Sequence, residues 1–479
     1  MHKLTPLIQE ITLPNPLEQT FALLADDPHP FWLDSSLAGG KMGRWSFMGS
    51  RPFLVFKTFG KEIITDREGA TTKTTGSPFK ALRKLINLYS LERGNSQIPF
   101  LGGAVGFFSY DLGRMVEHLP DHTQDDINVP DIYLGFYHTV LAIDHQENRA
   151  YVVATGMPRD GQEAKAKAAA DLAAFKARLL GSAPELPDPW QEPDIKASDI
   201  KTHFTPEAYC GAVQAVREYI MAGDIYQANM TQRLDAPLRM PPYQLYRRLR
   251  QANPAPFAAY LDCGDKLRVL SSSPERYLLL EDKVVETRPI KGTLPRGKTP
   301  QEDQQNAEAL LASVKDRAEL VMIIDLERND LGRVCAYGTV RVPELIVLEK
   351  YATVFHLVST VRGKLAEGKD VVDLLKASFP GGSITGAPKI RAMEIIEELE
   401  PLRRGIYTGS IGYIGFDGRA DLNIVIRTFV NKNDKLHLQV GGGIVFDSVP
   451  ILEYEETLHK AKALLKSLGI TQFPEVPRD

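Results

Sequence analysis

A single lysine at the end of a strand-like run has the clearest chemical potential in this chain. Lys291 follows Pro289, which cannot donate to a sheet ladder and belongs at the edge or end of a strand. Gly292 comes next, where the backbone adopts conformations closed to other residues or lets a ligand approach closely. The pattern predicts an amine presented from a stiff strand into a tight Gly292-Thr293 bend. Such an amine becomes a nucleophile when burial or a nearby cation lowers its pKa from about 10.4, whereas a solvated surface lysine is the ordinary alternative.

Pairs of carboxylates at helical spacing are the second feature. Asp316 and Glu319 are three residues apart in one segment of helical character, and Glu453 and Glu456 are three apart in another, so each pair shares a helix face. Two such pairs could hold Mg²⁺ through a few oxygens and leave positions open for a substrate. The absence of nearby His and Cys favours a hard cation over zinc. A solvated charged face is the usual explanation for either pair alone.

Other polar residues stand at strand ends. Glu275 ends one strand and Lys291 follows the next hairpin, so we expect the acid and the amine to be neighbours, in a salt bridge or in a catalytic site. Gln227 lies in a strand-like run and His356 in an apolar run. Taken singly, each is more often an ordinary strand or core residue than a functional one. Arg427 is suited to binding a carboxylate.

Two glycine-rich segments could face a ligand. Residues 379–389 form a loop that opens a helix, which is an anion-binding arrangement. It is not a P-loop, because Ala387-Pro388 stands where Gly-Lys is required. The run Gly441–Gly443 would let backbone N–H groups point at a ligand.

The elements that must position these residues follow from apolar periodicity and from turn and capping residues. Short strands fill the first 150 residues, and a hairpin over 277–288 leads the chain to Lys291. The expected helices cover 162–180, 205–223, 302–325, 389–399 and 450–468. Prolines crowd residues 181–206, and we predict an N-terminal domain over 1–185, a linker over 186–204 and a catalytic domain over 205–470.

Composition limits the class of protein. The chain has 479 residues, a formal net charge of -4 and three widely spaced cysteines, which argues against nucleic acid or anionic membrane as partners and against disulfides or a thiolate zinc site. The first residues show no signal peptide, and no apolar run approaches the roughly 18 residues of a membrane span. We therefore predict a soluble cytoplasmic protein.

Many segments from about residue 200 to 468 together resemble, in order, the chorismate-utilising enzymes, which include anthranilate, aminodeoxychorismate, isochorismate and salicylate synthases. The matching segments are Gly223–Met230, Ser273–Glu275, Arg288–Thr293, Asp316–Val334, Thr353–Thr360, Phe379–Pro401, Gly405–Thr428, Gly441–Phe446 and Glu453–Ala461. The resemblance implies an α/β (α+β) fold, a large anthranilate-synthase-type architecture of β-sheets packed against helices. The first third resembles anthranilate-type members more loosely. Its run Leu33–Ser36 is similar to a weakened form of their tryptophan-binding motif, which argues against feedback inhibition.

The resemblance also implies roles, residue by residue. Lys291 would be the nucleophile, Glu275 the general acid, and His356 matches an active-site histidine that anthranilate synthases are associated with using in pyruvate elimination. Mg²⁺ would be held by Glu319 and Glu456, with Asp316 and Glu453 as outer or water-mediated ligands. The residues implied in substrate binding are Gln227, Gly292, Thr293, Ser383, Thr385, Tyr407, Arg427, Gly441, Gly442, Gly443 and Lys460.

One position separates the reactions of the family. Anthranilate synthases carry Pro-Ile-Ala-Gly-Thr, whereas this chain carries Pro-Ile-Lys-Gly-Thr over 289–293, which is similar to aminodeoxychorismate synthase component I. The resemblance implies that chorismate and ammonia become 4-amino-4-deoxychorismate, a precursor of 4-aminobenzoate and folate, with ammonia supplied by a separate glutaminase subunit. Gln227 stands where isochorismate synthases have a lysine that activates water, and an amide cannot act as that base. An anthranilate synthase component I and a catalytically silent binding or regulatory paralogue remain alternatives.

Overall fold

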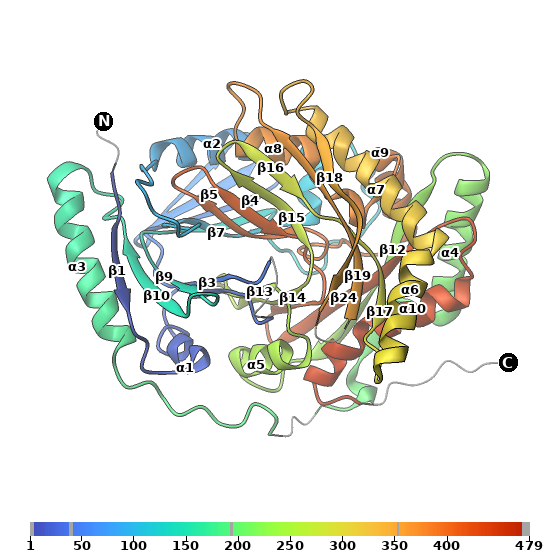
Figure 1. Ribbon diagram of the computed structural model, residues 1–479, viewed down its shortest axis with the longest axis horizontal. Helices are drawn as coiled ribbons and strands as arrows, with labels where there is room; N and C mark the ends of the chain where they lie inside the picture. The colour runs from blue at the N-terminus through green and yellow to red at the C-terminus, as the bar shows by residue number, and fades with distance from the viewer. Residues whose placement is uncertain (1–3, 38–41, 192–194, 352–353, 472–479) are drawn as a thin grey trace.

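Two large antiparallel sheets pack face to face in the part of the chain that the structure describes (Figure 1). This computed structural model describes residues 4–37, 42–191, 195–351 and 354–471. Pro193 of the predicted linker and Thr353 of a matching segment lie outside the described residues. The mixed architecture of sheets packed against helices confirms the predicted fold class.

The first sheet combines strands that are far apart in the sequence. Its order is β1 (Leu7–Ile11), β10 (Arg149–Ala154), β9 (Thr139–Asp144), β3 (Trp45–Gly49), β2 (Phe31–Asp34), β13 (Phe257–Asp262), β14 (Leu267–Ser273), β23 (Thr428–Lys432), β24 (Lys435–Ile444), β12 (Gln227–Pro237) and β11 (Lys201–Thr202), with β20 (Gly386–Ala387) beside β12.

The second sheet also combines strands that are far apart in the sequence. Its order is β17 (Ile290–Pro295), β19 (Val354–Lys364), β16 (Val284–Thr287), β15 (Arg276–Glu281), β22 (Ala420–Asn423), β21 (Ser410–Gly415), β7 (Gly103–Phe108), β8 (Ile132–Tyr137), β4 (Leu54–Phe59), β5 (Glu62–Arg67) and β6 (Ala70–Thr75), with β18 (Arg341–Lys350) beside β19.

Both sheets therefore contain strands from either side of the predicted linker. β2 pairs with β13, and β7 pairs with β21. The core between the sheets is also shared, since the ring of Phe47 lies 5.7 Å from that of Tyr413. The domain boundaries at residues 1–185 and 205–470 stay a prediction. In the structure, side chains from these two parts pack into one core.

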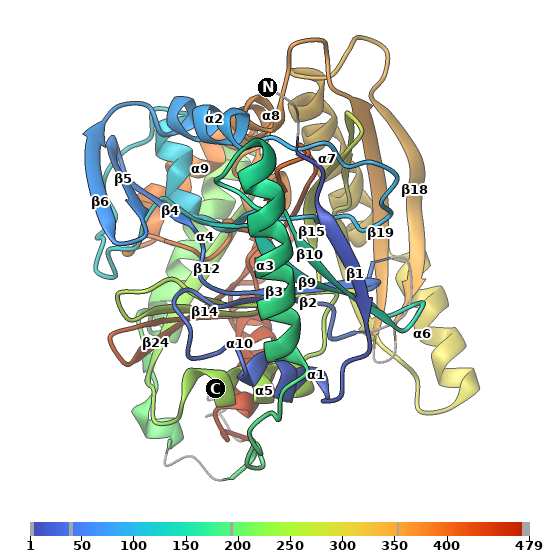
Figure 2. The same cartoon turned by 90° about the vertical axis from the view of Figure 1, so that its left-hand side faces the viewer.

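Helices cover the ends and outer faces of the sheets. They are α1 (Leu17–Ala22), α2 (Pro78–Leu88), α3 (Gly161–Leu179), α4 (Pro206–Met221), α5 (Pro242–Ala252), α6 (Pro300–Ala312), α7 (Val314–Gly332), α8 (Val371–Ser378), α9 (Lys389–Leu399) and α10 (Pro450–Ser467), with short 3₁₀ turns η1 (Tyr110–Met115), η2 (Ala197–Asp199) and η3 (Gly382–Ile384). α3 lies over β1 and β10 (Figure 2), while α4, α7 and α10 lie at the opposite end of the molecule (Figure 1). None of the helices in the described ranges is long and apolar enough to cross a membrane.

Most of the expected helices are confirmed, but one is wrong in its continuity. The segment predicted as one helix over 302–325 breaks at Ser313, whose backbone is extended with ψ of 108°. The Ser313 hydroxyl accepts a hydrogen bond from the Asp316 N–H at 3.2 Å, as an N-cap does, and so starts α7 afresh. The start of α4 is as predicted, because Thr205 caps the helix before Pro206.

Candidate active site

The chain crosses between the two sheets twice at one place. It leaves β14 through Pro274 and Glu275 into β15, and it returns from β22 through residues 424–427 into β23. The two crossing segments are bonded together, since the Glu275 carbonyl accepts from the Ile424 N–H at 3.0 Å and the Arg427 carbonyl accepts from the Ser272 N–H at 3.1 Å. Between the end of β22 at Asn423 and the start of β23 at Thr428, the crossing holds Arg427 at φ of 53°.

Lys291 lies on a bulged strand. The register of β17 on β19 shifts between Lys291 and Thr293, so Gly292, with φ of 74°, is the extra residue. The predicted tight bend is therefore a bulge within a strand and not a turn at its end. A Cβ at Gly292 would lie 2.9 Å from Asp316 Cγ, so only glycine lets the first turn of α7 pack this closely. The Thr293 hydroxyl lies 2.8 Å from His356 Nδ1.

The Lys291 amine faces acids but is paired with none at hydrogen-bonding distance. Its Nζ lies 3.9 Å from Glu319 Oε2, and its side chain is 14% exposed. Burial lowers the pKa of Lys291, although the carboxylates of Glu319 and Glu275 oppose the shift. A larger share of the amine is then uncharged near neutral pH, which is the form that attacks an electrophile.

An unpartnered amide and a glycine lie beside this amine. Both polar atoms of the Gln227 side chain are buried, and neither has a hydrogen-bond partner among the described residues. A Cβ at Gly443 would lie 2.3 Å from Gln227 Nε2 and 3.5 Å from Lys291 Nζ. Gly443 therefore leaves the space on which amide and amine converge. A buried amide without partners is uncommon, so this space is suited to a small polar ligand.

Carboxylates of α10 lie over the neighbouring Gly442, and Glu319 of α7 interacts with one of them, Glu453. A Cβ at Gly442 would lie 3.5 Å from Glu453 Oε2 and 3.6 Å from Glu456 Oε1. Burial raises the pKa of Glu453 and that of Glu319. The Glu456 side chain is 49% exposed; its partial burial would raise its pKa, but the Lys460 ammonium at 2.7 Å, with Lys315 and Lys291, lowers it.

This carboxylate cluster suits a cation completed by a substrate. No group of three metal-ligating side chains in the described part of the chain is close enough to form a ready-made metal centre. Mg²⁺, however, is commonly held by one or two carboxylates together with water and substrate oxygens. Burial is the main cause of the raised pKa values of Glu319 and Glu453, and neighbouring carboxylates add to it, so a cation such as Mg²⁺ fits these residues.

Glu275 is a buried acid with a raised pKa. Its side chain is 6% exposed, and burial raises its pKa to about 6. The Ser383 hydroxyl and the Ile290 N–H donate to the carboxyl group and limit that rise. Thr385 is placed differently, because its hydroxyl donates to the Gly381 and Gly382 carbonyls and holds the loop together.

The remaining predicted residues are linked by contacts to Thr293, Gly441 or one another. Burial lowers the pKa of His356 to about 4, so its ring is neutral near pH 7. Burial raises the pKa of Tyr407 above its usual range and lowers that of the neighbouring Arg427. The Arg427 guanidinium donates to the Lys460 carbonyl at 2.6 Å, and the Lys460 ammonium donates to the Gly441 carbonyl at 2.8 Å.

Sequence reasoning gave no role to Glu327. This residue is buried on α7, eight residues after Glu319, and its Oε2 has no partner among the described residues. Eight residues make just over two helical turns and turn Glu327 about 80° around the helix from Glu319, so periodicity alone does not place the two acids on one face.

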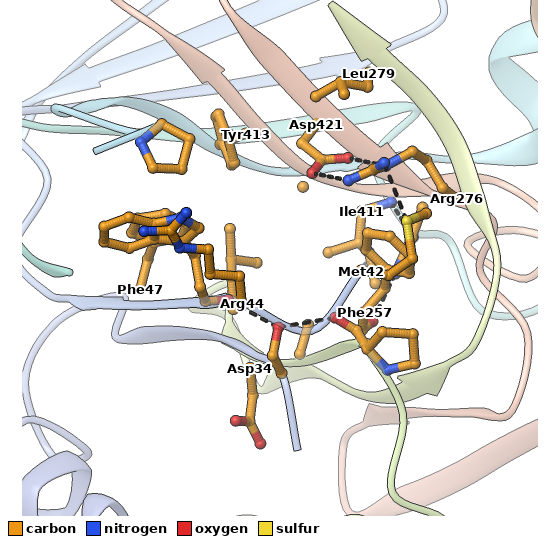
Figure 3. A pocket seen from close by; sticks show the side chains of 18 of the residues that line it. Asp34, Met42, Arg44, Phe47, Phe257, Arg276, Leu279, Ile411, Tyr413 and Asp421 are labelled. Atoms are coloured by element: carbon orange, nitrogen blue, oxygen red, sulfur yellow. Dashed lines mark hydrogen bonds and ion pairs between the residues drawn. The ribbon is translucent and has the colours of Figure 1, made fainter. Parts of the chain in front are cut away.

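A separate cavity of about 350 Å³ lies between the sheets and is called here the inter-sheet cavity (Figure 3). Phe47 and Tyr413 line it from opposite sheets, and Arg276 binds both oxygens of Asp421 at 2.9 Å. Leu33, Asp34 and Ser35 of the weakened motif also line it, but the Asp34 carboxylate is bound by Arg250 at 2.8 Å.

Known proteins resemble this chain over nearly all of its length. Residues 30–466 match the family described as chorismate binding enzyme. Aminodeoxychorismate synthase component 1 of Escherichia coli (strain K12) is 42% identical over 449 residues, covering 94% of this chain and 95% of that protein. Anthranilate synthase component 1 of Thermus thermophilus is 43% identical over 460 residues, covering 96% of each chain. The crystal structure of anthranilate synthase component I from Streptococcus pneumoniae TIGR4 has a TM-score of 0.77 at 32% identity, covering 89% of this chain and 93% of that one.

Proposed function

This chain belongs to the chorismate binding enzymes, and from that premise we propose that it converts chorismate and ammonia to 4-amino-4-deoxychorismate. The observation that carries the proposal is the Lys291 amine, which is buried, has a lowered pKa and lies beside Glu319 and the unpartnered amide of Gln227. A nucleophile so placed splits a difficult displacement into two easier ones.

In the proposed reaction Lys291 attacks the ring carbon next to the one that bears the ring carboxylate. Glu275 gives its proton to the departing hydroxyl, which leaves as water. Ammonia then bonds to the carbon that lost the hydroxyl, and the bond to Lys291 breaks. The pKa of Glu275, raised to about 6, keeps part of the population protonated near neutral pH.

The substrate carboxylates require cationic and N–H partners. Gly441–Gly443 lie on β24, and the Lys460 ammonium donates to the Gly441 carbonyl. Arg427 donates in turn to the Lys460 carbonyl, so both residues can supply positive charge for a substrate carboxylate. Glu319 and Glu456 would hold Mg²⁺, with Glu453 and Asp316 behind them. When bound, this cation would neutralise the acids and bind the ring carboxylate.

Ammonia and not water is the proposed incoming group. Gln227 presents an amide, which can accept and donate hydrogen bonds but cannot take a proton from water. We propose that a separate glutaminase component delivers the ammonia, since the relatives are named as component 1 of their enzymes. The product, on this proposal, supplies 4-aminobenzoate and folate biosynthesis.

The test combines product analysis with intact-protein mass spectrometry. Purified protein, chorismate, Mg²⁺ and ammonium should give aminodeoxychorismate, and omitting ammonium should give a chorismate-derived adduct at Lys291. Lys291→Ala should abolish the adduct and lower turnover by about 100-fold or more. Lys298→Ala, at an exposed lysine of the same segment, is the matched control and should behave as the wild type.

Anthranilate synthesis is the second candidate, because the Thermus thermophilus relative is as similar as the aminodeoxychorismate synthase. Production of fluorescent anthranilate and pyruvate by the wild type would establish it. Lys291 would then be a bystander in the chemistry, and Lys291→Ala would retain turnover.

A further inference from the structure

The strand that carries Lys291 lies at the edge of its sheet. β17 is the first strand in the order of the second sheet and pairs with β19 along one side. Its ladder is interrupted by the bulge at Gly292, between Lys291 and Thr293. A bulged edge strand has fewer ladder hydrogen bonds to fix it than a central strand has, so the direction of the Lys291 side chain depends on further contacts.

Glu349 of β18 holds the chain just before Lys291. The Arg288 guanidinium donates to Glu349 Oε1 at 2.6 Å and also lies 3.3 Å from Glu344 Oε2. The Arg288 side chain is 6% exposed and that of Glu349 19%, so water and salt screen this contact weakly. Because Arg288 lies between β16 and β17, Glu349 fixes the point at which the chain passes from one strand to the next.

The other oxygen of Glu349 is linked to the chain just after Lys291 through two rings. The Tyr351 hydroxyl donates to Glu349 Oε2 at 2.8 Å, and the Tyr351 ring packs edge-on against His356, with centroids 5.4 Å apart and planes at 66°. His356 Nδ1 in turn lies 2.8 Å from the Thr293 hydroxyl. The row crosses three strands, since Glu349 of β18 and Thr293 of β17 are both register partners of His356 in β19.

Tyr351 is also tied to the end of β17. Its carbonyl accepts from the Arg296 guanidinium at 2.8 Å, and both oxygens of Asp303 accept from Arg296 at 2.7 and 2.8 Å. Tyr351 is therefore held at its backbone and at its hydroxyl, while its ring contacts His356.

We propose that Glu349 and Tyr351 are positioning residues of this site, which hold the chain on both sides of the Gly292 bulge and so direct the Lys291 amine toward the substrate. The proposal rests on the proposed role of Lys291 as nucleophile. Both residues act through others, namely Arg288 on one side of the bulge and the Thr293–His356 pair on the other. Their loss should therefore lower kcat, which depends on the direction of the amine, and leave KM little changed.

The kinetic experiment compares Tyr351→Phe and Glu349→Gln with the wild type in chorismate consumption, with Mg²⁺ and saturating ammonium. Tyr351→Phe loses only the hydroxyl that donates to Glu349, and its kcat should fall about 10-fold while KM stays within about two-fold. Glu349→Gln also loses the charge that faces Arg288, and its kcat should fall about 10- to 100-fold. Tyr337→Phe, at a fully exposed tyrosine, is the matched control and should keep the wild-type kcat.

A second measurement follows His356 directly and does not depend on turnover. The imidazole faces Thr293, Glu349, Tyr351 and Arg427. Burial, with the charge of Arg427, lowers the pKa of His356 to about 4. Tyr351→Leu removes the ring that covers the imidazole, so an NMR titration should find the pKa of His356 raised above about 5, because water then reaches the charged form. Tyr351→Phe keeps the ring and should keep the wild-type value.

Several outcomes would overturn the proposal. Wild-type kcat in Tyr351→Phe would show that the hydroxyl holds nothing the reaction needs, and a rise in KM with unchanged kcat would make the two residues part of substrate binding. An unmoved His356 titration in Tyr351→Leu would break the link from Tyr351 to Thr293. If Glu349→Gln failed to fold, Tyr351→Phe, which leaves the Arg288 ion pair in place, would decide alone. If the wild type consumed no chorismate, the proposed function would fail first, and the wild-type arm would show this separately.

Discussion

The inter-sheet cavity and the lysine site, the space bounded by Lys291, Glu275 and Gln227, differ in how their charges are satisfied. In the cavity, Arg276 binds both oxygens of Asp421 and Asp34 is bound by Arg250. In the lysine site the amine is 3.9 Å from its closest acid, and the Gln227 amide has no partner in the described chain.

This difference supports the proposal that the chemistry takes place at the lysine site. Buried charges that are fully paired contribute to a rigid, specific core, whereas buried polar groups left unpaired cost stability and persist where a ligand or a reaction uses them. The presence of a cavity is a poor guide here, because the inter-sheet cavity shares no residue with the acids around Lys291.

The largest expected effect in this comparison is at Glu275. Glu275→Gln keeps the shape and the hydrogen bonds from Ser383 but cannot give up a proton, so kcat/KM should fall about 10²- to 10⁴-fold. The basic limb of the pH profile should disappear with it. Steady-state kinetics across pH would check this, and a variant with wild-type turnover would remove Glu275 from the mechanism.

The carboxylate cluster should show the next largest effect. Glu319→Gln and Glu456→Gln each remove one charge from the proposed Mg²⁺ site, and each should raise the Mg²⁺ concentration that gives half-maximal turnover by about 10- to 100-fold. Glu455→Gln, a neighbour on α10 outside the predicted ligand set, is the control. An unchanged Mg²⁺ requirement in both variants would contradict the assignment.

Features of this site that are set by neighbouring residues in the sequence could be predicted, whereas features set by long-range packing could not. The Lys291 segment, the start of α4 at Thr205 and the end-of-chain helix follow from capping, turns and periodicity, which are local. The bulge at Gly292 and the left-handed Arg427 were not predicted, because sheet pairing and the crossing between sheets impose them. Glu327 was missed because its burial and the lack of a partner for its Oε2 among the described residues appear only in the folded chain.

Gly443→Ala tests the space between the amide and the amine. A methyl group there would lie 2.3 Å from Gln227 Nε2 and 3.5 Å from Lys291 Nζ, so the amide must move and the ligand space shrinks. Turnover should fall by about 10- to 100-fold with little loss of stability, since displacements near 1 Å have costs of this size. Activity and melting temperature together would check it. A variant that melts far earlier and keeps its specific activity would show that Gly443 serves folding.

The smallest effect on turnover is expected from the paired cavity, and this prediction separates the two regions most directly. Asp421→Asn leaves the Arg276 guanidinium, 10% exposed, without its bidentate acid. Removing one partner of a fully buried ion pair lowers the free energy of unfolding by about 3 to 5 kcal/mol. Because the Asp421 side chain is 20% exposed, we expect Asp421→Asn to lower the free energy of unfolding by about 3 kcal/mol or less. Denaturant unfolding should show that loss, while kcat/KM for chorismate stays within about two-fold of the wild type because no acid or amine of the lysine site has lost a partner. A large fall in kcat/KM without a loss of stability would instead couple the inter-sheet cavity to the chemistry, and the contrast between a paired region that stabilises and an unpaired region that reacts would no longer hold.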